Sequence, residues 1–411
     1  MQTLDPSARA EGAARSFTLF LFFDSFAQAI VTPLLPRLAA DVQGGDVAAA
    51  ALLLGFLELS WALPQVFAAP WLGAWSDCVG RKPALVLSAL GIAAEILLDT
   101  FARGPGWLVL GRVICGLCCA GQAVAFAALA DLHAPAERPA AFARGAAAIW
   151  AGIVVGPALG GILAGGDLRL PFGIAFGVAL VALALVVNAP ETRQAGTAHS
   201  PADEPSVQEG AASALSLSPL GVAPMLGVAF ALTAIAVQGV DNLIVLYTER
   251  RYGWTSLHFG LVCAGVAAVG WWVQAWLAPR VFDRVGAVRA ACVGLLFQGA
   301  GALGVAAAAT GGPFTLAYAA SMVGSMARPA LQAALSERVS EDRQGALQGA
   351  LSALSAGASV LAPPVFAGLF VWGLGLGGAW IALPVLVSGL VLLLALGMLL
   401  AWARHDKGCG A

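Results

Sequence analysis

Long apolar runs follow one another along most of the chain, and they limit the possible folds more than any other feature. A helix needs about 20 mostly apolar residues to cross a lipid bilayer. Runs of this kind, separated by short polar breaks, predict an all-α membrane protein. We expect twelve transmembrane helices, at residues 17–38, 48–74, 84–103, 107–128, 143–165, 170–190, 222–248, 256–278, 289–310, 313–335, 345–370 and 378–403.

The shortage of charged residues leads to the same fold class. Charged side chains make up 11% of the 411 residues, whereas soluble globular chains carry about 25%. Because so few charges cannot cover a particle of this size in water, a polytopic membrane protein is expected. The net charge of −2 provides no basic field that would attract nucleic acid.

One long polar connection separates the first six runs from the last six. Its Pro, Ser, Glu and Gly content is typical of a flexible linker. The predicted parts are an N-terminal segment at 1–16, a six-helix half at 17–190, a linker at 191–220, a second six-helix half at 221–403 and a tail at 404–411.

Two short motifs recur at a single spacing. The sequence Asp-Cys-Val-Gly that begins at Asp77 is followed 206 residues later by Asp-Arg-Val-Gly at Asp283. Pro157 is followed at the same offset by Pro363. This recurrence predicts two homologous, pseudo-symmetric six-helix halves, which is a known plan among transporters.

Lysine and arginine are distributed unevenly between the two sides of the predicted bilayer. If the N-terminus is inside, fourteen of them lie in cytoplasmic segments and five in external segments. The remaining two, Arg112 and Arg328, fall within helices. Since positive residues collect on the cytoplasmic side, we expect both termini and the linker to be cytoplasmic.

A loop between the second and third predicted helices gathers charge in a chain that otherwise avoids it. Its residues are Gly73-x-x-x-Asp77-x-x-Gly80-Arg81-Lys82-Pro83. Gly73 allows close approach of a neighbouring helix, and Gly80 permits a tight turn. The pattern resembles the loop signature of the major facilitator superfamily, with Cys78 where that family usually has a basic residue. The resemblance implies a cytoplasmic gate between the two halves.

Two further motifs resemble the same family. A stripe at i, i+4 spacing in the fourth predicted helix consists of Leu108, Arg112, Gly116 and Ala120. The resemblance links its arginine to proton transfer. A run in the fifth predicted helix resembles the signature of the family's antiporters and consists of Gly152, Gly156, Pro157, Gly160 and Gly161. With three motifs in order, the chain is identified as a member of the superfamily.

Within the superfamily, the chain resembles the bacterial tetracycline/proton antiporters over most of its length. The matching stretches are 22–38, 65–91, 246–254 and 328–354. The resemblance places Asp24, Glu95 and Gln238 at polar positions of that group. Gly270 and Gln298 stand where the group has a histidine and an aspartate, so two groups tied there to proton coupling or drug transport are replaced.

Ionisable side chains inside membrane spans are costly, so each one is a candidate functional residue. A carboxyl that is neutral in one state and ionised in another is what proton coupling requires. The candidates for proton coupling are Asp24, Glu58, Glu95 and Arg112. Asp99 lies near the outer end of the third predicted helix, where it can reach water.

Asp241 and Arg328 lie in the seventh and tenth predicted helices. The resemblance implies that these helices line the central cavity. The two residues either neutralise each other as a buried pair or bind a polar or zwitterionic ligand. Together with Gln238 and Gln298 they are the candidate substrate-binding residues.

The resemblance implies a proton-coupled efflux antiporter that exports a small amphiphilic compound or drug by alternating access. The alternatives are export of a physiological metabolite such as a siderophore, and a transport-dead receptor or sensor of the same fold. Because we find no nucleophile–base pair or metal-ligand set in the sequence, no enzyme activity, metal or cofactor is expected. We expect a monomer in the bacterial inner membrane, with a small molecule, protons and lipid as its partners.

Overall fold

A computed structural model describes residues 6–134, 137–192, 223–340 and 343–408. Within these ranges every regular element is a helix, which confirms the all-α fold class. Most of the predicted linker lies outside the described residues, as do the first five and last three residues of the chain.

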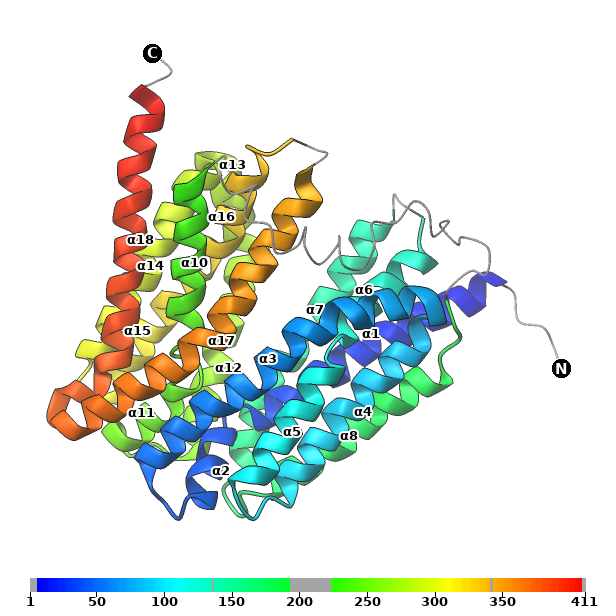
Figure 1. The fold of residues 1–411 in the computed structure, drawn as a ribbon, viewed down its shortest axis with the longest axis horizontal. Helices are drawn as coiled ribbons and strands as arrows, with labels where there is room; N and C mark the ends of the chain where they lie inside the picture. Colours follow the sequence, from blue (N-terminus) through cyan, green and yellow to red (C-terminus); the bar gives the residue numbers. More distant parts are fainter. Residues whose placement is uncertain (1–5, 135–136, 193–222, 341–342, 409–411) are drawn as a thin grey trace. The chain divides into compact units, whose positions relative to one another are not determined.

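Helices occupy nearly all of the described chain (Figure 1). Those before the predicted linker are α1 (Pro6–Val31), α2 (Leu35–Val42), α3 (Val47–Val79), α4 (Arg81–Thr100), α5 (Pro105–Cys118), α6 (Gly121–Leu132), α7 (Arg138–Leu163) and α8 (Leu170–Asn188). Those after it are α10 (Pro224–Gln238), α11 (Leu243–Tyr252), α12 (Ser256–Trp272), η2 (Val273–Leu277), α13 (Ala278–Val285), α14 (Ala287–Ala307), α15 (Gly311–Val323), η3 (Gly324–Met326), α16 (Ala327–Ser336), α17 (Gln344–Leu376), η5 (Gly378–Ala382) and α18 (Leu383–Gly408).

The chain divides into two compact units. The first unit holds the described residues within 1–42, 60–207 and 255–264. The second unit holds those within 43–59, 208–254 and 265–411. Helices α3 and α12 therefore each contribute one part to the first unit and one part to the second.

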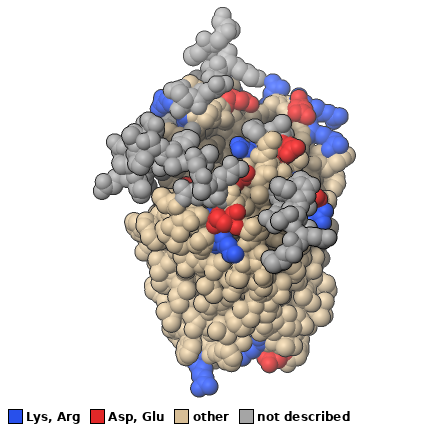
Figure 2. Space-filling model, turned by 90° about the vertical axis from the view of Figure 1, so that its right-hand side faces the viewer, with Lys and Arg blue, Asp and Glu red and all other residues tan. Residues whose placement is uncertain are grey.

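The lengths of the helices fit a multi-pass membrane protein. Ten described helical segments are long and apolar enough to cross a bilayer, and α10 with α11 forms an eleventh candidate. The predicted span 313–335 corresponds to α15, η3 and α16, and each of these pieces is too short to cross alone. On the face drawn in Figure 2, a broad band without charged residues lies below the red and blue side chains, and charge returns at the bottom edge.

Several predicted spans are interrupted. A turn follows the end of α1 at Val31, and another follows the end of α10 at Gln238, where α11 is bent away by 49°. A break after Cys118 separates α5 from α6, and the 3₁₀ turn η3 begins at Gly324. The ends of α5 and α15, at Cys118 and Val323, are 205 residues apart, one residue from the offset of the sequence repeat. Unwound backbone inside a membrane is tolerated where it is buried in protein or lines a cavity, so the breaks mark candidate site positions.

Two glycines at the same offset adopt the same kind of turn. Gly80 has φ 122° and precedes α4, and Gly286 has φ 79° and precedes α14. Positive φ values of this size favour glycine over residues with a Cβ. The tight turn predicted at Gly80 is therefore present, and its counterpart in the second unit shares the backbone requirement.

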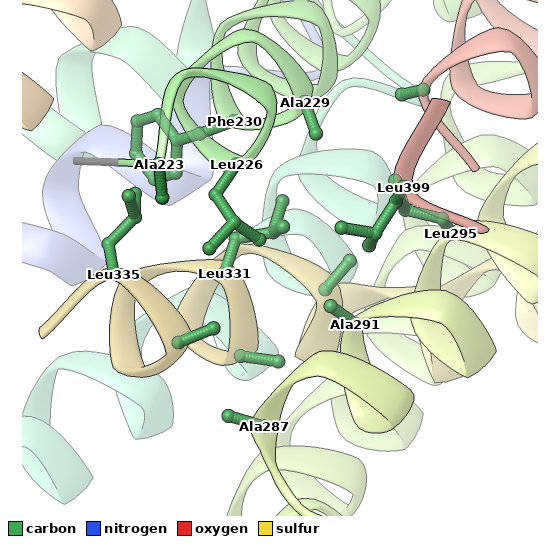
Figure 3. Packing of buried hydrophobic residues seen from close by; sticks show 14 of the residues in the cluster. Ala223, Leu226, Ala229, Phe230, Ala287, Ala291, Leu295, Leu331, Leu335 and Leu399 are labelled. Atoms are coloured by element: carbon green, nitrogen blue, oxygen red, sulfur yellow. The ribbon is translucent and has the colours of Figure 1, made fainter. Parts of the chain in front are cut away.

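Each unit has its own apolar core. In the first unit, Phe17, Phe20 and Leu21 of α1 are fully buried among residues of α4, α6 and α8. In the second unit, small residues and leucines of α10, α14, α16 and α18 pack together, with Leu226 and Leu331 fully buried (Figure 3). These cores hold the helices that carry the candidate site residues.

Candidate functional site

A cavity of about 630 Å³ in the first unit contains several predicted site residues. Asp24 of α1 lines this cavity, and so do Gly73, Asp77 and Arg81 of the charged loop. Cys119, at the break between α5 and α6, lines it as well. The structure thus brings a predicted coupling carboxyl and the predicted gating loop to one cavity.

Asp24 is almost completely buried, with 3% of its surface exposed. Gln28, one helical turn later, donates a hydrogen bond from Nε2 to Asp24 Oδ2 at 3.1 Å. Gln122 on α6 is a second hydrogen-bonding neighbour. Both partners are uncharged amides, so they hold the carboxyl in place without neutralising a charge on it.

Ser88 on α4 supports the break between α5 and α6. Its hydroxyl donates to the Cys118 carbonyl oxygen at 2.6 Å and accepts from the Ala120 N–H at 3.2 Å. One side chain therefore satisfies two backbone groups that the break leaves without helical partners. This corrects the prediction of a continuous helical stripe from Leu108 to Ala120, because α5 ends at Cys118 and Ala120 precedes α6.

Arg112 and Glu95 form a buried ion pair between α5 and α4. Arg112 Nε lies 3.2 Å from Glu95 Oε1, and the two side chains are 19% and 10% exposed. The helices approach closely here, since a Cβ added at Gly111 would meet the Glu95 Cα at 3.3 Å. Gly116 of the same motif faces the Trp61 carbonyl group of α3 in the same way.

Asp99 joins this pair as a second carboxyl. It lies one turn after Glu95 on α4, is 3% exposed, and is within electrostatic range of both Glu95 and Arg112. Its Oδ1 is buried and has no hydrogen-bond partner among the described residues. The expectation that Asp99 reaches water is therefore wrong, because the packing of α4 covers it. Its i, i+4 spacing from Glu95 is the signal that could have grouped the two.

Arg81 is the centre of the charged loop. Its guanidinium forms ion pairs with Asp77, one turn earlier, and with Asp131 at the end of α6. The Asp131 contact joins Nε to Oδ2 at 3.0 Å, and Nη1 also donates to Ser76 Oγ at 3.0 Å. The loop is thus attached to α6 as well as to the helices that it connects.

Glu191, just after α8, was not singled out by the sequence. Its carboxylate accepts hydrogen bonds from the backbone N–H groups of Arg81 at 2.9 Å and Lys82 at 3.0 Å. It therefore caps the N-terminus of α4 from 110 residues away in the sequence. No local pattern could have revealed this contact, because N-terminal caps are usually found within the same turn.

We expect Glu191→Gln to destabilise the protein, because an amide offers one acceptor oxygen where the carboxylate offers two. Loss of a helix N-cap costs about 0.5–2 kcal/mol. Glu137→Gln is the matched control, since Glu137 precedes α7 without any side-chain capping bond. Thermal unfolding of both purified variants measures the difference, and equal unfolding temperatures would contradict the capping role.

The glycines of the antiporter-like run form the surface of α7 that contacts α1. A Cβ added at Gly152 would meet the backbone nitrogen of Phe26 at 2.8 Å. At Gly156 it would meet the Ile30 nitrogen at 2.9 Å, and at Gly160 it would meet the Ile30 carbonyl oxygen. The i, i+4 spacing of these glycines therefore lets the two backbones pack directly against each other.

Gly161 and Pro157 of the same run face the first part of α12 within the first unit. A Cβ at Gly161 would meet the Ser256 carbonyl oxygen at 2.6 Å, and a Cβ at Gly260 would meet the Pro157 carbonyl oxygen. The motif thus packs on two sides of α7.

Gly160→Ala is expected to lower the unfolding temperature, because the new methyl group would meet the Ile30 carbonyl oxygen. Overpacking of this kind costs about 1–3 kcal/mol. Gly177→Ala in α8 is the control, since nothing lies within 4 Å of a Cβ at that position. Equal unfolding temperatures of the two variants in detergent would show that Gly160 of α7 is not in direct contact with the Ile30 backbone of α1.

A smaller cavity, of about 90 Å³, lies in the second unit beside the break between α10 and α11. Asp241, Gln298 and Tyr318 line it. Oε1 of Gln298 is buried and has no hydrogen-bond partner among the described residues. Because a buried acceptor without a partner is costly, a ligand that donates a hydrogen bond to Gln298 would be stabilised here.

Arg328 binds partners other than Asp241. Its Nη2 donates to Ser355 Oγ at 3.2 Å, and its guanidinium carbon lies 5.6 Å from the centre of the Phe230 ring. Asp241 is within electrostatic range of Arg328, but no ion pair within the described part of the chain joins the two. Of the two alternatives for Asp241 and Arg328, a buried ion pair or ligand binding, the ion pair is not formed in this structure.

The other polar candidates of the second unit have partners near the same break. Gln238, the last residue of α10, donates to Ser359 Oγ on α17. Asn242, in the turn before α11, donates from Nδ2 to Glu58 Oε1 at 2.7 Å. Glu58 is thus held at this break, in the unit that also contains Asp241.

Comparison with known proteins decides the family. The sequence profile of the Major Facilitator Superfamily matches residues 17–363. The chain belongs to the Major Facilitator Superfamily. It is therefore a transporter and not an enzyme, and proteins of this superfamily generally need no cofactor.

Individual relatives agree with the superfamily assignment. A tetracycline resistance protein of class D from Salmonella ordonez is 33% identical over 350 residues, covering 84% of this chain and 86% of the relative. The class B tetracycline resistance protein from Escherichia coli is 29% identical over 87% of this chain and 88% of its own length. A crystal structure of a peptide transporter in complex with sulfate covers 98% of this chain and 99% of that structure, with a TM-score of 0.77 and 15% identity. This last similarity concerns the fold alone.

Proposed function

We propose that this superfamily member exports a small amphiphilic compound in exchange for protons. The relatives named for tetracycline resistance support drug export. In this proposal, proton entry drives outward movement of the substrate while the two six-helix halves alternate between inward-open and outward-open states. The protein would act as a monomer in the bacterial inner membrane, with both termini in the cytoplasm and no nucleic acid partner.

The cavity that Asp24 shares with the charged loop is the observation that carries this proposal. A carboxyl can couple transport to protons only if its protonation and the opening of the site affect each other. Asp24 and Arg81 both line the same cavity of about 630 Å³. A change in the loop's ion pairs can therefore alter the surroundings of Asp24 without a long chain of intermediates.

Glu95 and Arg112 are the second proposed element of coupling. A single arginine balances only one of two carboxylates, and Asp99 is the second carboxyl beside this pair. Uptake of one proton by the two acids would complete the charge balance of the cluster. We propose that Glu95 and Asp99 take up and release this proton beside the permanent charge of Arg112 during the transport cycle, and that Glu58 responds to the state of the α10–α11 break.

Substrate recognition is assigned to the second unit. Asp241 and the unpartnered Gln298 oxygen line one small cavity. Gln238 of α10 and Arg328 of α16 each donate to a serine of α17, Ser359 and Ser355, which lie one helical turn apart. A hydrogen-bond-donating group of the substrate would satisfy Gln298 beside Tyr318 and Met322, with the rest of the substrate outside this small cavity.

Transport by the purified protein in sealed lipid vesicles tests the proposed function. Tetracycline and a panel of other amphiphilic compounds would be loaded, and movement would be followed with and without an imposed proton gradient. We expect at least one compound to cross the vesicle membrane when the proton gradient is imposed, and not to cross it without the gradient. Movement driven by a sodium gradient after the proton gradient has been collapsed would refute proton coupling. A bound compound that is never moved would favour the sensor alternative.

Asp77→Asn is expected to slow export and to leave substrate affinity nearly unchanged, because Asp77 pairs with Arg81 in the loop and is proposed to gate the cavity. The exchange rate in vesicles and the equilibrium affinity in detergent measure the two effects separately. Asp283→Asn, at the same offset in the second repeat, tests whether the two loops are equivalent. An unchanged turnover with a large loss of affinity would contradict the gating role.

A further inference from the structure

A second large cavity lies in the first unit, away from Asp24. Its volume is about 680 Å³, and it is lined by residues of α1, α6 and α7, which pack against one another (Figure 1). Its polar wall contains Glu11, Arg15, His133 and Arg144. Leucines, among them Leu19 and Leu132, form much of the remaining wall.

This cavity lies where membrane-spanning segments begin and end. The spans that border it run from Glu11 to Val31, from Pro105 to Leu132 and from Ala140 to Leu163. The lining residues therefore lie at the start of the Glu11–Val31 span, at the end of the Pro105–Leu132 span and at the start of the Ala140–Leu163 span. Such positions lie at the level of the lipid headgroups, where basic side chains meet phosphate and apolar side chains meet acyl chains.

The positive charge of Arg144 on the cavity wall is not neutralised by its hydrogen-bonding partner, and Arg15 has an exposed partner. Arg15 Nη2 lies 2.6 Å from Glu11 Oε1, and this pair is solvent-exposed, with side-chain exposures of 75% and 68%. Arg144 Nη2 lies 3.5 Å from His133 Nε2, and His133 Nδ1 lies 2.8 Å from the Leu129 carbonyl oxygen. Because a carbonyl oxygen only accepts, Nδ1 carries the proton and Nε2 is the acceptor towards Arg144.

The charges on the cavity wall favour an anionic ligand. Arg15 and Arg144 supply two positive charges and Glu11 supplies one negative charge. No carboxylate within the described ranges forms an ion pair with Arg144. An exposed ion pair such as that of Arg15 contributes little stability, so Arg15 can turn to a stronger anion. A guanidinium binds phosphate oxygens in a bidentate manner.

We propose that this cavity binds one anionic phospholipid, with its phosphate on Arg144 and Arg15 and its glycerol and acyl chains along the leucine wall. A lipid is favoured over free phosphate because the wall joins cationic and apolar surface at the start of a span. Leu19, one helical turn after Arg15 on α1, is 46% exposed and lines the same cavity. The proposal is independent of proton coupling and of the exported compound.

The test uses the full-length protein in detergent, with phosphatidylglycerol and phosphatidylcholine of the same acyl chains as probes. We expect phosphatidylglycerol to raise the unfolding temperature in a saturable way, and phosphatidylcholine to have a much smaller effect. Arg144→Gln should weaken the apparent affinity for phosphatidylglycerol about fivefold, since one basic residue near a membrane surface is worth about 1 kcal/mol. Arg289→Gln, an exposed arginine at the start of α14, is the control and should bind as the wild type does.

Three results would overturn the proposal. These are equal effects of the two lipids, an unchanged phosphatidylglycerol affinity in Arg144→Gln, and a full stabilising effect of inorganic phosphate alone. The last result would assign the site to a free anion. If Arg144→Gln does not fold, Arg15→Gln replaces it, because Arg15 is exposed and its removal leaves the helix packing intact.

Discussion

Asp24→Asn is expected to abolish proton-driven export and to leave the protein folded. Asparagine preserves the size of the side chain and can still accept a hydrogen bond from Gln28, but it cannot take up or release a proton. Loss of a group that transfers a proton reduces rates by on the order of 100-fold or more. Substrate efflux from vesicles with an imposed proton gradient measures the loss.

Exchange without a gradient separates coupling from binding in this variant. If Asp24 carries the proton, Asp24→Asn should still exchange labelled for unlabelled substrate across the vesicle membrane. Asp41→Asn is the matched control in the same unit, because Asp41 pairs with Arg169 at 3.4 Å while its side chain is 55% exposed. Gradient-driven export by Asp24→Asn at the rate of this control would remove Asp24 from the coupling mechanism.

Arg112→Gln is expected to cause the largest loss of stability. Removing the arginine leaves Glu95 and Asp99 together in buried surroundings without a positive charge. Breaking a buried ion pair by removing one partner costs about 3–5 kcal/mol. Chemical or thermal unfolding in detergent should therefore show a large decrease for Arg112→Gln. Arg169→Gln should show a much smaller loss, because its ion pair is exposed and its other contact is one part-buried hydrogen bond to the Thr100 carbonyl oxygen.

The double variant Glu95→Gln/Arg112→Gln distinguishes structural pairing from proton coupling. Removing both charges of the pair should recover part of the stability, because no unpaired guanidinium remains and Asp99 is the one carboxyl left in the cluster. Proton-driven export should not recover, since Glu95, one of the two acids proposed to share the proton, and the balancing charge of Arg112 are both lost. Recovery of both properties would show that the pair serves only the packing of α4 on α5.

The sequence predicted the parts of the site that follow from local rules. A charge in an apolar run is costly wherever the chain folds, so Asp24, Glu95 and Arg112 could be selected without knowing their neighbours. Glycines one turn apart on a helix must lie on one face. Gly152 and Gly156 therefore share one face of their helix, whereas the helix that this face contacts, α1, follows from the structure alone.

The partners of these residues were decided by tertiary structure alone. The cap of α4 by Glu191 and the support of the α5 break by Ser88 join residues that are far apart in the sequence. Asp99 is buried because α4 packs against its neighbours, and its position near a helix end indicated the opposite. Arg328 contacts Ser355 and Phe230 instead of Asp241. The sequence by itself determined the membrane-spanning helices, the charges within them and the small residues that allow close approach, because burial cost and helical periodicity act within one segment. Only the tertiary structure decided which charges meet and which cavity each lines, because these depend on which helices pack together.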